Sequence, residues 1–155
     1  MSEILWCADN GDGTYRNPVL YCDYSDPDAI CVNGTYYLTA STFNYVPGLP
    51  ILTSRDLVNW KLRNYAVKNI PEARYAAPQH AQGIWAPAIR FQNRRFYIYY
   101  GMPDEGIYMV STENPLGDWD SPVLVKPGKG LIDPCPFWDD DGRAYIIHGL
   151  SLIHI

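Results

Sequence analysis

Positive charge is scarce in this sequence and is never gathered into a block. The 12 Lys and Arg residues stand against 17 Asp and Glu residues, which gives a formal net charge of −5. Proteins that bind nucleic acid neutralise a series of phosphates with clustered Lys and Arg side chains. Because no such cluster is present, we expect no nucleic-acid partner.

Long apolar runs are also missing. No stretch approaches the roughly 20 apolar residues that a membrane-spanning helix needs. Residues 1–4 lack the basic and apolar regions of a secretory signal. We therefore expect no membrane partner and a cytoplasmic location.

Metal-binding patterns are equally scarce. The cysteines have neither CxxC spacing nor neighbouring histidines, which disfavours a zinc site. The Asp-rich segments 9–13 and 139–142 lack the acidic residue that closes a calcium loop, so we expect turns there. We expect no metal ion or other cofactor, and reduced, partly buried thiols at Cys7, Cys22, Cys31 and Cys135.

Aromatic residues, glycine and proline are abundant. The chain has 13 Tyr, 5 Trp and 4 Phe, together with 12 Gly and 13 Pro. Aromatic residues favour strands, whereas glycine and proline favour turns. The composition therefore predicts an all-β fold of short strands.

An internal repeat organises the chain. Residues 26–38, 86–98 and 133–146 align as a short strand, a polar turn and a second strand. In the first two copies a third apolar run follows, and then a polar segment that ends in Trp60 or Trp119, which we interpret as structural residues. Units of three or four antiparallel strands recurring at roughly 50 residues are typical of β-propeller blades. We expect two complete blades and the start of a third, with a β-sandwich as the alternative architecture.

The residue before the repeated proline is a candidate catalytic position. It is Asp26 in the first unit, Ala86 in the second and Asp133 in the third. The first strands of propeller blades line the central channel, so both carboxylates would face one funnel. Paired carboxylates suit acid/base hydrolysis. The alternative is that each aspartate only caps a turn.

Several strings occur in the order of a known family: 16–20, 24–28, 41–43, 47–51, 54–60, 83–87 and 132–134. Together they resemble glycoside hydrolase family 43 from about Arg16 to Gly149. The resemblance implies a five-bladed β-propeller of inverting glycosidases, which includes β-xylosidases, α-L-arabinofuranosidases and arabinanases. Residues 1–149 would be the N-terminal part of such a catalytic domain, and the substrate an oligosaccharide or a small glycoside.

The resemblance also implies roles for particular residues. Asp26 matches the general base that activates water, and Asp133 matches the aspartate that orients the general acid and raises its pKa. Phe43 and Trp85 match aromatic positions that shape the innermost sugar subsite. The general acid, a glutamate, lies beyond the third repeat in the family, so we expect the chain as written to be inactive.

Two alternative functions stay open. A noncatalytic carbohydrate-binding propeller would use the same funnel without an ionised Asp26. A protein-interaction propeller would tolerate loss of both aspartates. His80 could reach the funnel mouth, although a surface-loop position is the interpretation we favour. Glu105 and Glu113 lie at turn-like positions in the second unit, and neither is assigned as the acid.

The last residues depart from the repeat. Residues 150–155 are the translation of CTG TCT CTT ATA CAC ATC, an end sequence used in transposon-based DNA library preparation. Such segments are excluded from fold reasoning. We expect an adapter-derived tail at 150–155 that makes no blade-like strand pairing.

Overall fold

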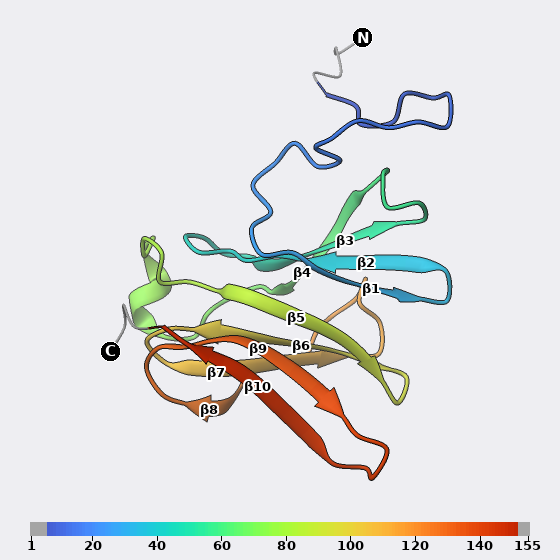
Figure 1. Cartoon of the computed structure of the whole chain (residues 1–155). Helices are drawn as coiled ribbons and strands as arrows, with labels where there is room; N and C mark the ends of the chain where they lie inside the picture. Colours follow the sequence, from blue (N-terminus) through green and yellow to red (C-terminus); the bar gives the residue numbers. More distant parts are fainter. Residues whose placement is uncertain (1–5, 152–155) are drawn as a thin grey trace.

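The computed structural model describes residues 6–151, and its elements are β-strands apart from one short 3-10 turn at Ala73–Ala76. The strands form two four-stranded antiparallel sheets and one two-stranded sheet (Figure 1). The all-β prediction is therefore confirmed. No helix among residues 6–151 is long and apolar enough to cross a membrane.

Each sheet follows chain order. The first contains β1 (Asp28–Val32), β2 (Thr35–Thr39), β3 (Gly48–Ser54) and β4 (Lys61–Val67). The second contains β5 (Trp85–Gln92), β6 (Arg95–Met102), β7 (Gly106–Thr112) and β8 (Val123–Pro127). The third contains β9 (Leu131–Trp138) and β10 (Ala144–Leu150).

The predicted hairpin turns are present. Asn33 and Gly34 connect β1 to β2 with φ angles of 51° and 73°, and Asn93 and Arg94 connect β5 to β6 with φ angles of 50° and 63°. Two successive positive φ angles give the tight turn whose twist matches that of paired strands. Residues 139–142 turn between β9 and β10.

The main core lies between the first two sheets. Alternate side chains of β3, β5, β6 and β7 meet there, because strand residues point in turn to opposite faces. Trp119 packs against this core, as expected of a structural residue. Trp60 donates its indole N–H to the Leu57 carbonyl at 2.9 Å. The largest fully buried side chains are Tyr100, Leu49, Ile51, Leu52, Ile84, Ile89, Ile98, Met102 and Ile107.

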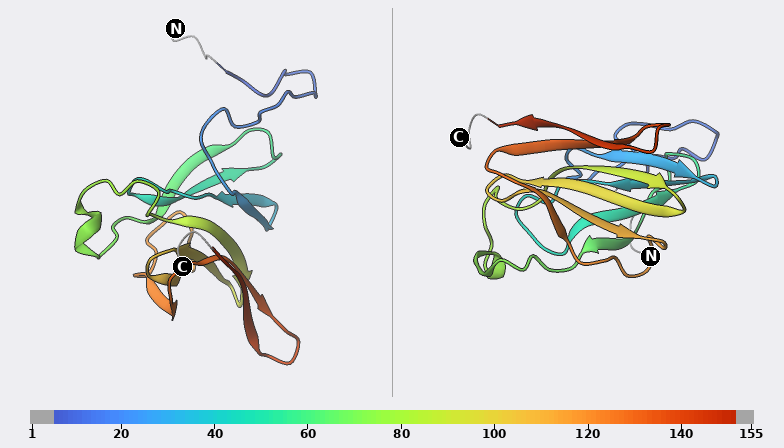
Figure 2. Two further views of the ribbon diagram at one scale, coloured as in Figure 1. Left: turned by 60° about the vertical axis from the view of Figure 1, so that its left-hand side comes forward. Right: turned by 90° about the horizontal axis from the view of Figure 1, so that it is seen from below.

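The first strands of the sheets converge. β1, β5 and β9 each form an edge of their own sheet, β1 packs beside β5, and β5 packs beside β9. Figure 2 shows the sheets as successive layers. Across this junction Arg90 Nη1 lies 2.7 Å from Asp28 Oδ2, which also accepts the Ile89 N–H at 2.8 Å. The convergence predicted from the repeat is therefore observed for these strands.

The segment before β1 extends away from the sheets (Figures 1 and 2). The Asp9 side chain closes a turn by accepting the Gly11 N–H at 2.8 Å, so the predicted turn is present. Asn59 Nδ2 donates to Asp9 Oδ2 at 2.9 Å and ties this segment to the connection between β3 and β4.

Two expectations are corrected. The four cysteines are free, but all are exposed rather than partly buried. Two of them, Cys31 and Cys135, lie on first strands, and each occupies an exposed position of an alternating strand. The expectation that 150–155 makes no blade-like strand pairing is wrong for Leu150, which pairs with Leu131 between β10 and β9. Ser151 follows the strand, and its N–H donates to the Gly130 carbonyl at 2.7 Å. Backbone pairing needs no particular side chain, so β10 continues past Gly149. Residues 152–155 lie outside the described part.

Candidate active site

Asp26 and Asp133 adopt the same uncommon backbone conformation. Asp26 lies two residues before β1 with φ 49°, and Asp133 lies near the start of β9 with φ 53°. Only a few per cent of residues other than glycine have positive φ, although aspartate tolerates it better than most. Such conformations cluster at functional sites. In the middle repeat, Ala86 lies near the start of β5, beside a break in its pairing with β6.

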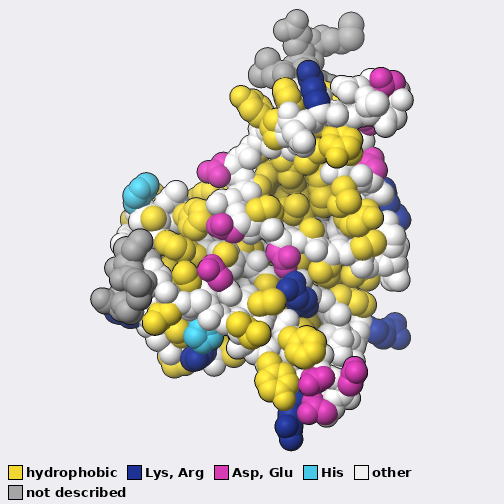
Figure 3. Space-filling model, viewed as in Figure 1, with side chains coloured by type: hydrophobic (Ala, Val, Ile, Leu, Met, Phe, Trp, Pro, Cys, Tyr) yellow, Lys and Arg dark blue, Asp and Glu magenta, His cyan; other side chains and the backbone are white. Residues whose placement is uncertain are grey.

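The two carboxylates interact. Partial burial and then the negative charge of Asp26 raise the pKa of Asp133 above its ordinary value. A charge–charge effect of this kind means that the two carboxylates lie within range of each other's charge. Figure 3 shows acidic side chains on this face, over the part where the chain enters β1 and β5. The structure therefore brings the predicted pair together, while the chemical roles of the two aspartates stay predictions.

Hydroxyl groups hold the Asp26 carboxylate. Ser41 Oγ donates to Asp26 Oδ2 at 2.8 Å, and Ser25 Oγ donates to the same oxygen at 3.2 Å. The Ser41 N–H also donates to the Ser25 carbonyl at 2.9 Å, which joins the chain after β2 to the chain before β1. Sequence reasoning identified Ser41 only as part of a family string and did not find this contact.

Phe43 and Trp85 form an aromatic corner. Their ring centroids are 5.4 Å apart and their planes are inclined by 86°, an edge-to-face contact. The Trp85 indole N–H donates to the Ala81 carbonyl at 3.1 Å, which fixes the ring. Both side chains are half-buried. The structure thus brings these two predicted residues together at the junction of the first two sheets.

A short backbone bridge holds this corner. Thr42 and Ile84 exchange backbone hydrogen bonds of 2.9 and 3.1 Å, and the Gly83 N–H donates to the Phe43 carbonyl at 2.8 Å. A Cβ atom at Gly83 would lie 2.6 Å from the Thr42 carbonyl oxygen and 2.7 Å from that of Phe43. The close approach of the two segments therefore requires glycine at position 83.

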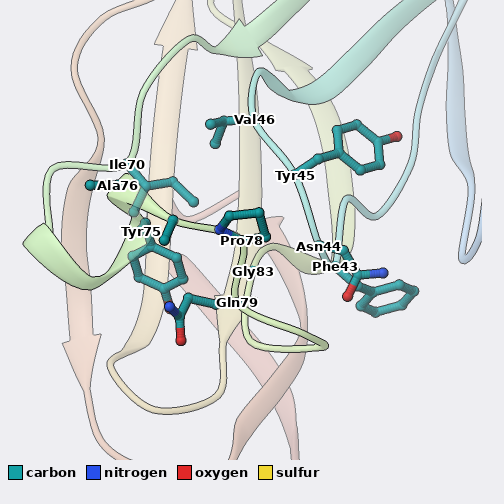
Figure 4. Close-up of a pocket in the computed structure, with 11 residues that line it drawn as sticks. Phe43, Asn44, Tyr45, Val46, Ile70, Tyr75, Ala76, Pro78, Gln79 and Gly83 are labelled. Carbon is teal, nitrogen blue, oxygen red and sulfur yellow. The ribbon is translucent and has the colours of Figure 1, made fainter.

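A pocket of about 210 Å³ adjoins the aromatic corner (Figure 4). It lies between the loop after β2 and the segment that contains the 3-10 turn. Its lining is largely apolar, and the Phe43 ring lies on the far side of the loop from Tyr75 (Figure 4). The labelled lining residues are Phe43, Asn44, Tyr45, Val46, Ile70, Tyr75, Ala76, Pro78, Gln79 and Gly83.

Arg74 fastens one wall of this pocket to the second sheet. Its guanidinium forms ion pairs with Glu105 and with Asp104, the latter at 3.0 Å, and it lies 4.7 Å from the Tyr75 ring centroid. Burial raises the pKa of Glu105, and Arg74 opposes that rise. His80 lies exposed in the same loop, as expected.

Within residues 6–151, no three His, Cys, Asp or Glu side chains gather in a way that could hold a metal ion. Successive antiparallel sheets thus carry two carboxylates and a corner of perpendicular aromatic rings, and sheets repeated in this way are the architecture of a β-propeller.

Comparison with known proteins specifies the family. The family model for glycosyl hydrolases family 43 matches residues 15–152, and the chain belongs to that family. The expected β-propeller fold is confirmed through its structural relatives, which are proteins of this family.

Curated relatives carry xylosidase and arabinofuranosidase names. A putative beta-xylosidase of Xylanibacter ruminicola is 45% identical over 140 residues, which are 90% of this chain and 26% of that protein. A non-reducing end alpha-L-arabinofuranosidase of Bacteroides ovatus is 36% identical over 151 residues, 92% of this chain and 28% of that protein. The chain therefore spans about a quarter of the length of these relatives.

A solved structure gives the same coverage. The family 43 protein of Bacillus licheniformis aligns with a TM-score of 0.77 at 31% identity, and the alignment covers 87% of this chain and 29% of that one.

Proposed function

We propose that this chain is the N-terminal part of a five-bladed propeller enzyme that hydrolyses pentose glycosides with inversion at the anomeric carbon. The substrate class, β-xylosides or α-L-arabinofuranosides, is supported by the names of the relatives. The two four-stranded sheets are its first two blades, and β9 and β10 begin the third.

The observation that carries the proposal is that Asp26 and Asp133, at matching points of the first and third repeats, share a positive φ, and that the charge of Asp26 adds to the effect of burial in raising the pKa of Asp133. Such an interaction favours a division of roles between two carboxylates. Asp26, held by hydroxyl donors, is the general base. Asp133 is a negative neighbour that raises the pKa of the acid and orients it.

The reaction follows from these roles. A water molecule attacks the anomeric carbon while Asp26 accepts one of its protons. The glycosidic C–O bond breaks with its electrons moving to the leaving oxygen, which takes a proton from the general acid. In inverting enzymes base and acid lie about 6.5–9.5 Å apart, which leaves room for the water. Phe43 and Trp85 offer ring faces and edges to the apolar side of the sugar.

The acid lies outside the described residues in this proposal, because the glutamates among them are engaged elsewhere. Glu72 accepts from the Tyr108 hydroxyl at 2.8 Å, Glu105 pairs with Arg74, and Glu113 lies 3.6 Å from Arg95. We therefore expect no hydrolysis by these residues alone. Positioned proton transfer typically contributes about 10²–10⁴-fold to a rate.

The test uses a completed enzyme, in which residues 1–149 are followed by the remainder of the gene recovered from source DNA. Aryl β-D-xyloside and aryl α-L-arabinofuranoside are the substrates, and proton NMR follows the anomer released first. We expect the inverted anomer, and a loss of about 10²-fold or more for Asp26→Asn. Asp118→Asn changes an exposed aspartate that pairs with Lys68; it is the matched control and should keep full activity.

Azide separates the base from other roles. In Asp26→Ala the anion needs no proton removed, so it should restore turnover and yield the glycosyl azide of inverted configuration. Full activity of Asp26→Asn, or release of the retained anomer, would contradict the mechanism. A different result would support a noncatalytic binding propeller. In that case the wild-type protein shows no hydrolysis, and the Asp26 variant binds sugar as well as the wild type does.

A further inference from the structure

The two oxygens of the Asp26 carboxylate differ in their surroundings. Oδ2 accepts from Ser41 at 2.8 Å and from Ser25 at 3.2 Å. Within the described part of the chain, Oδ1 has no hydrogen bond. Hydrogen bonds to a charged acceptor are stronger than those between neutral groups. The carboxylate is therefore fixed through Oδ2, and Oδ1 is the oxygen available to accept a proton.

Ser41 is the better placed of the two donors. Its side chain is buried, with 3% of the residue exposed, and its bond to Oδ2 is the shorter one. Its backbone is held on one side by the Ser25 carbonyl and on the other, through the adjacent Thr42, by Ile84. The hydroxyl is consequently fixed relative to both the first and the second sheet.

The same backbone links the base to the aromatic corner. Ser41 contacts Asp26, Thr42 bridges to Ile84, and Phe43 contacts Trp85. Any displacement of the Ser41 hydroxyl therefore changes the position of the carboxylate relative to the rings that would contact the sugar. Misplacement of a reacting group by about 1 Å can cost about 10²-fold in rate.

We propose that Ser41 is a positioning residue, which holds Oδ2 of Asp26 so that Oδ1 meets the hydrolytic water at the anomeric carbon. The proposal rests on the assignment of Asp26 as general base. Ser41 itself touches neither the water nor the sugar.

Ser41→Ala in the completed enzyme tests the proposal, since it removes only the hydroxyl. We expect kcat to fall about 10- to 100-fold, part of the full contribution of a positioned base, with KM changed less than about twofold. Ser41→Thr keeps a hydroxyl and should recover most of the loss. If Ser41→Ala does not fold, Ser41→Cys, whose slightly larger side chain carries only a weak donor, tests the same expectation.

Ser111→Ala is the matched control. Ser111 is also buried, with 7% exposed, and its Oγ donates to Asp120 Oδ2 at 2.8 Å, on β7 and away from the carboxylate pair. The Ser111→Ala variant should lose about as much stability as Ser41→Ala and keep the kcat of the wild type. An equal loss of kcat in Ser111→Ala would show a general loosening of the fold and overturn the proposal.

Asp26→Asn, measured in parallel, tests the general-base role of Asp26 separately from the positioning role of Ser41. A large loss in Asp26→Asn with wild-type kcat in Ser41→Ala would overturn the role of Ser41 and leave the base assignment intact. Retained activity in Asp26→Asn would overturn both.

Discussion

Asp26 and Asp133, which precede prolines in the first and third repeats, interact through space. Burial contributes most to the raised pKa of Asp133, and the charge of Asp26 adds to it. Removing that charge should therefore lower the pKa of Asp133 without restoring its ordinary value. Carboxyl-carbon NMR titration of Asp26→Asn checks this expectation. Asp118→Asn should leave the titration of Asp133 unchanged, and an equal shift in both variants would contradict a direct interaction.

Asp133→Asn should stabilise the fold at neutral pH while it impairs catalysis. The folded-state pKa of Asp133 lies above 3.8, so the folded chain binds the proton more tightly than the unfolded chain. Stability from this group is present below pH 3.8 and is lost as pH rises through the raised pKa. The neutral amide avoids that loss.

The measurement for Asp133→Asn is the midpoint of thermal unfolding, Tm, at several pH values. The Tm difference between the variant and the wild type should increase as pH rises from 3.8 to neutrality. A variant that is less stable than the wild type at pH 7 would contradict the expectation. kcat should fall by about 10²-fold in the completed enzyme.

Gly83→Ala should loosen the aromatic corner. The added Cβ would lie 2.6 Å from the Thr42 carbonyl oxygen, so the bridge to Ile84 must shift. Forcing atoms into a packed site costs about 1–3 kcal/mol of the free energy of unfolding. Gly117→Ala is the control, because its Cβ would meet mainly the flexible side chain of Asn114, at 3.0 Å. Thermal unfolding should show a clear fall in Tm for Gly83→Ala only.

Arg74→Met should release the pocket wall from the second sheet. Glu105 would lose its cationic partner while still partly buried, so its pKa should rise further. Protonated Glu105 needs no partner, and the loss of stability should therefore be small near pH 4 and grow toward neutrality.

Limited chymotrypsin digestion reports on the Arg74→Met wall directly. Cleavage after Tyr75 should become several-fold faster than in the wild type. Arg143→Met removes an arginine whose side chain is 75% exposed, and it should leave the rate of cleavage after Tyr75 unchanged. Unchanged cleavage in Arg74→Met would show that other contacts hold the loop.

Local chemistry explains why much of the fold could be predicted from the sequence. Asn33-Gly34 specifies a hairpin turn whatever surrounds it. The repeat located the first strands, but Asp26 lies two residues before β1, whereas Asp133 lies within β9. The fourth strands were harder to locate, because β4 alternates weakly and β8 is exposed throughout.

The contacts of the site were less accessible to sequence reasoning. A serine hydroxyl finds its partner only when the chain has folded, so the bond from Ser41 to Asp26 had no local signal. The ion pair of Asp28 with Arg90 joins two sheets for the same reason. Both residues of that pair lie within or beside the repeated strings, which is the one signal that could have suggested it.

Residues 41, 42 and 43 each reach a different partner, namely Asp26, Ile84 and Trp85. Because successive side chains point in different directions, inserting or deleting one residue here would redirect every side chain that follows. In evolutionary terms, this stretch can change by substitution but not in length. Length variation among relatives should therefore fall on either side, in residues 44–46 and 68–82.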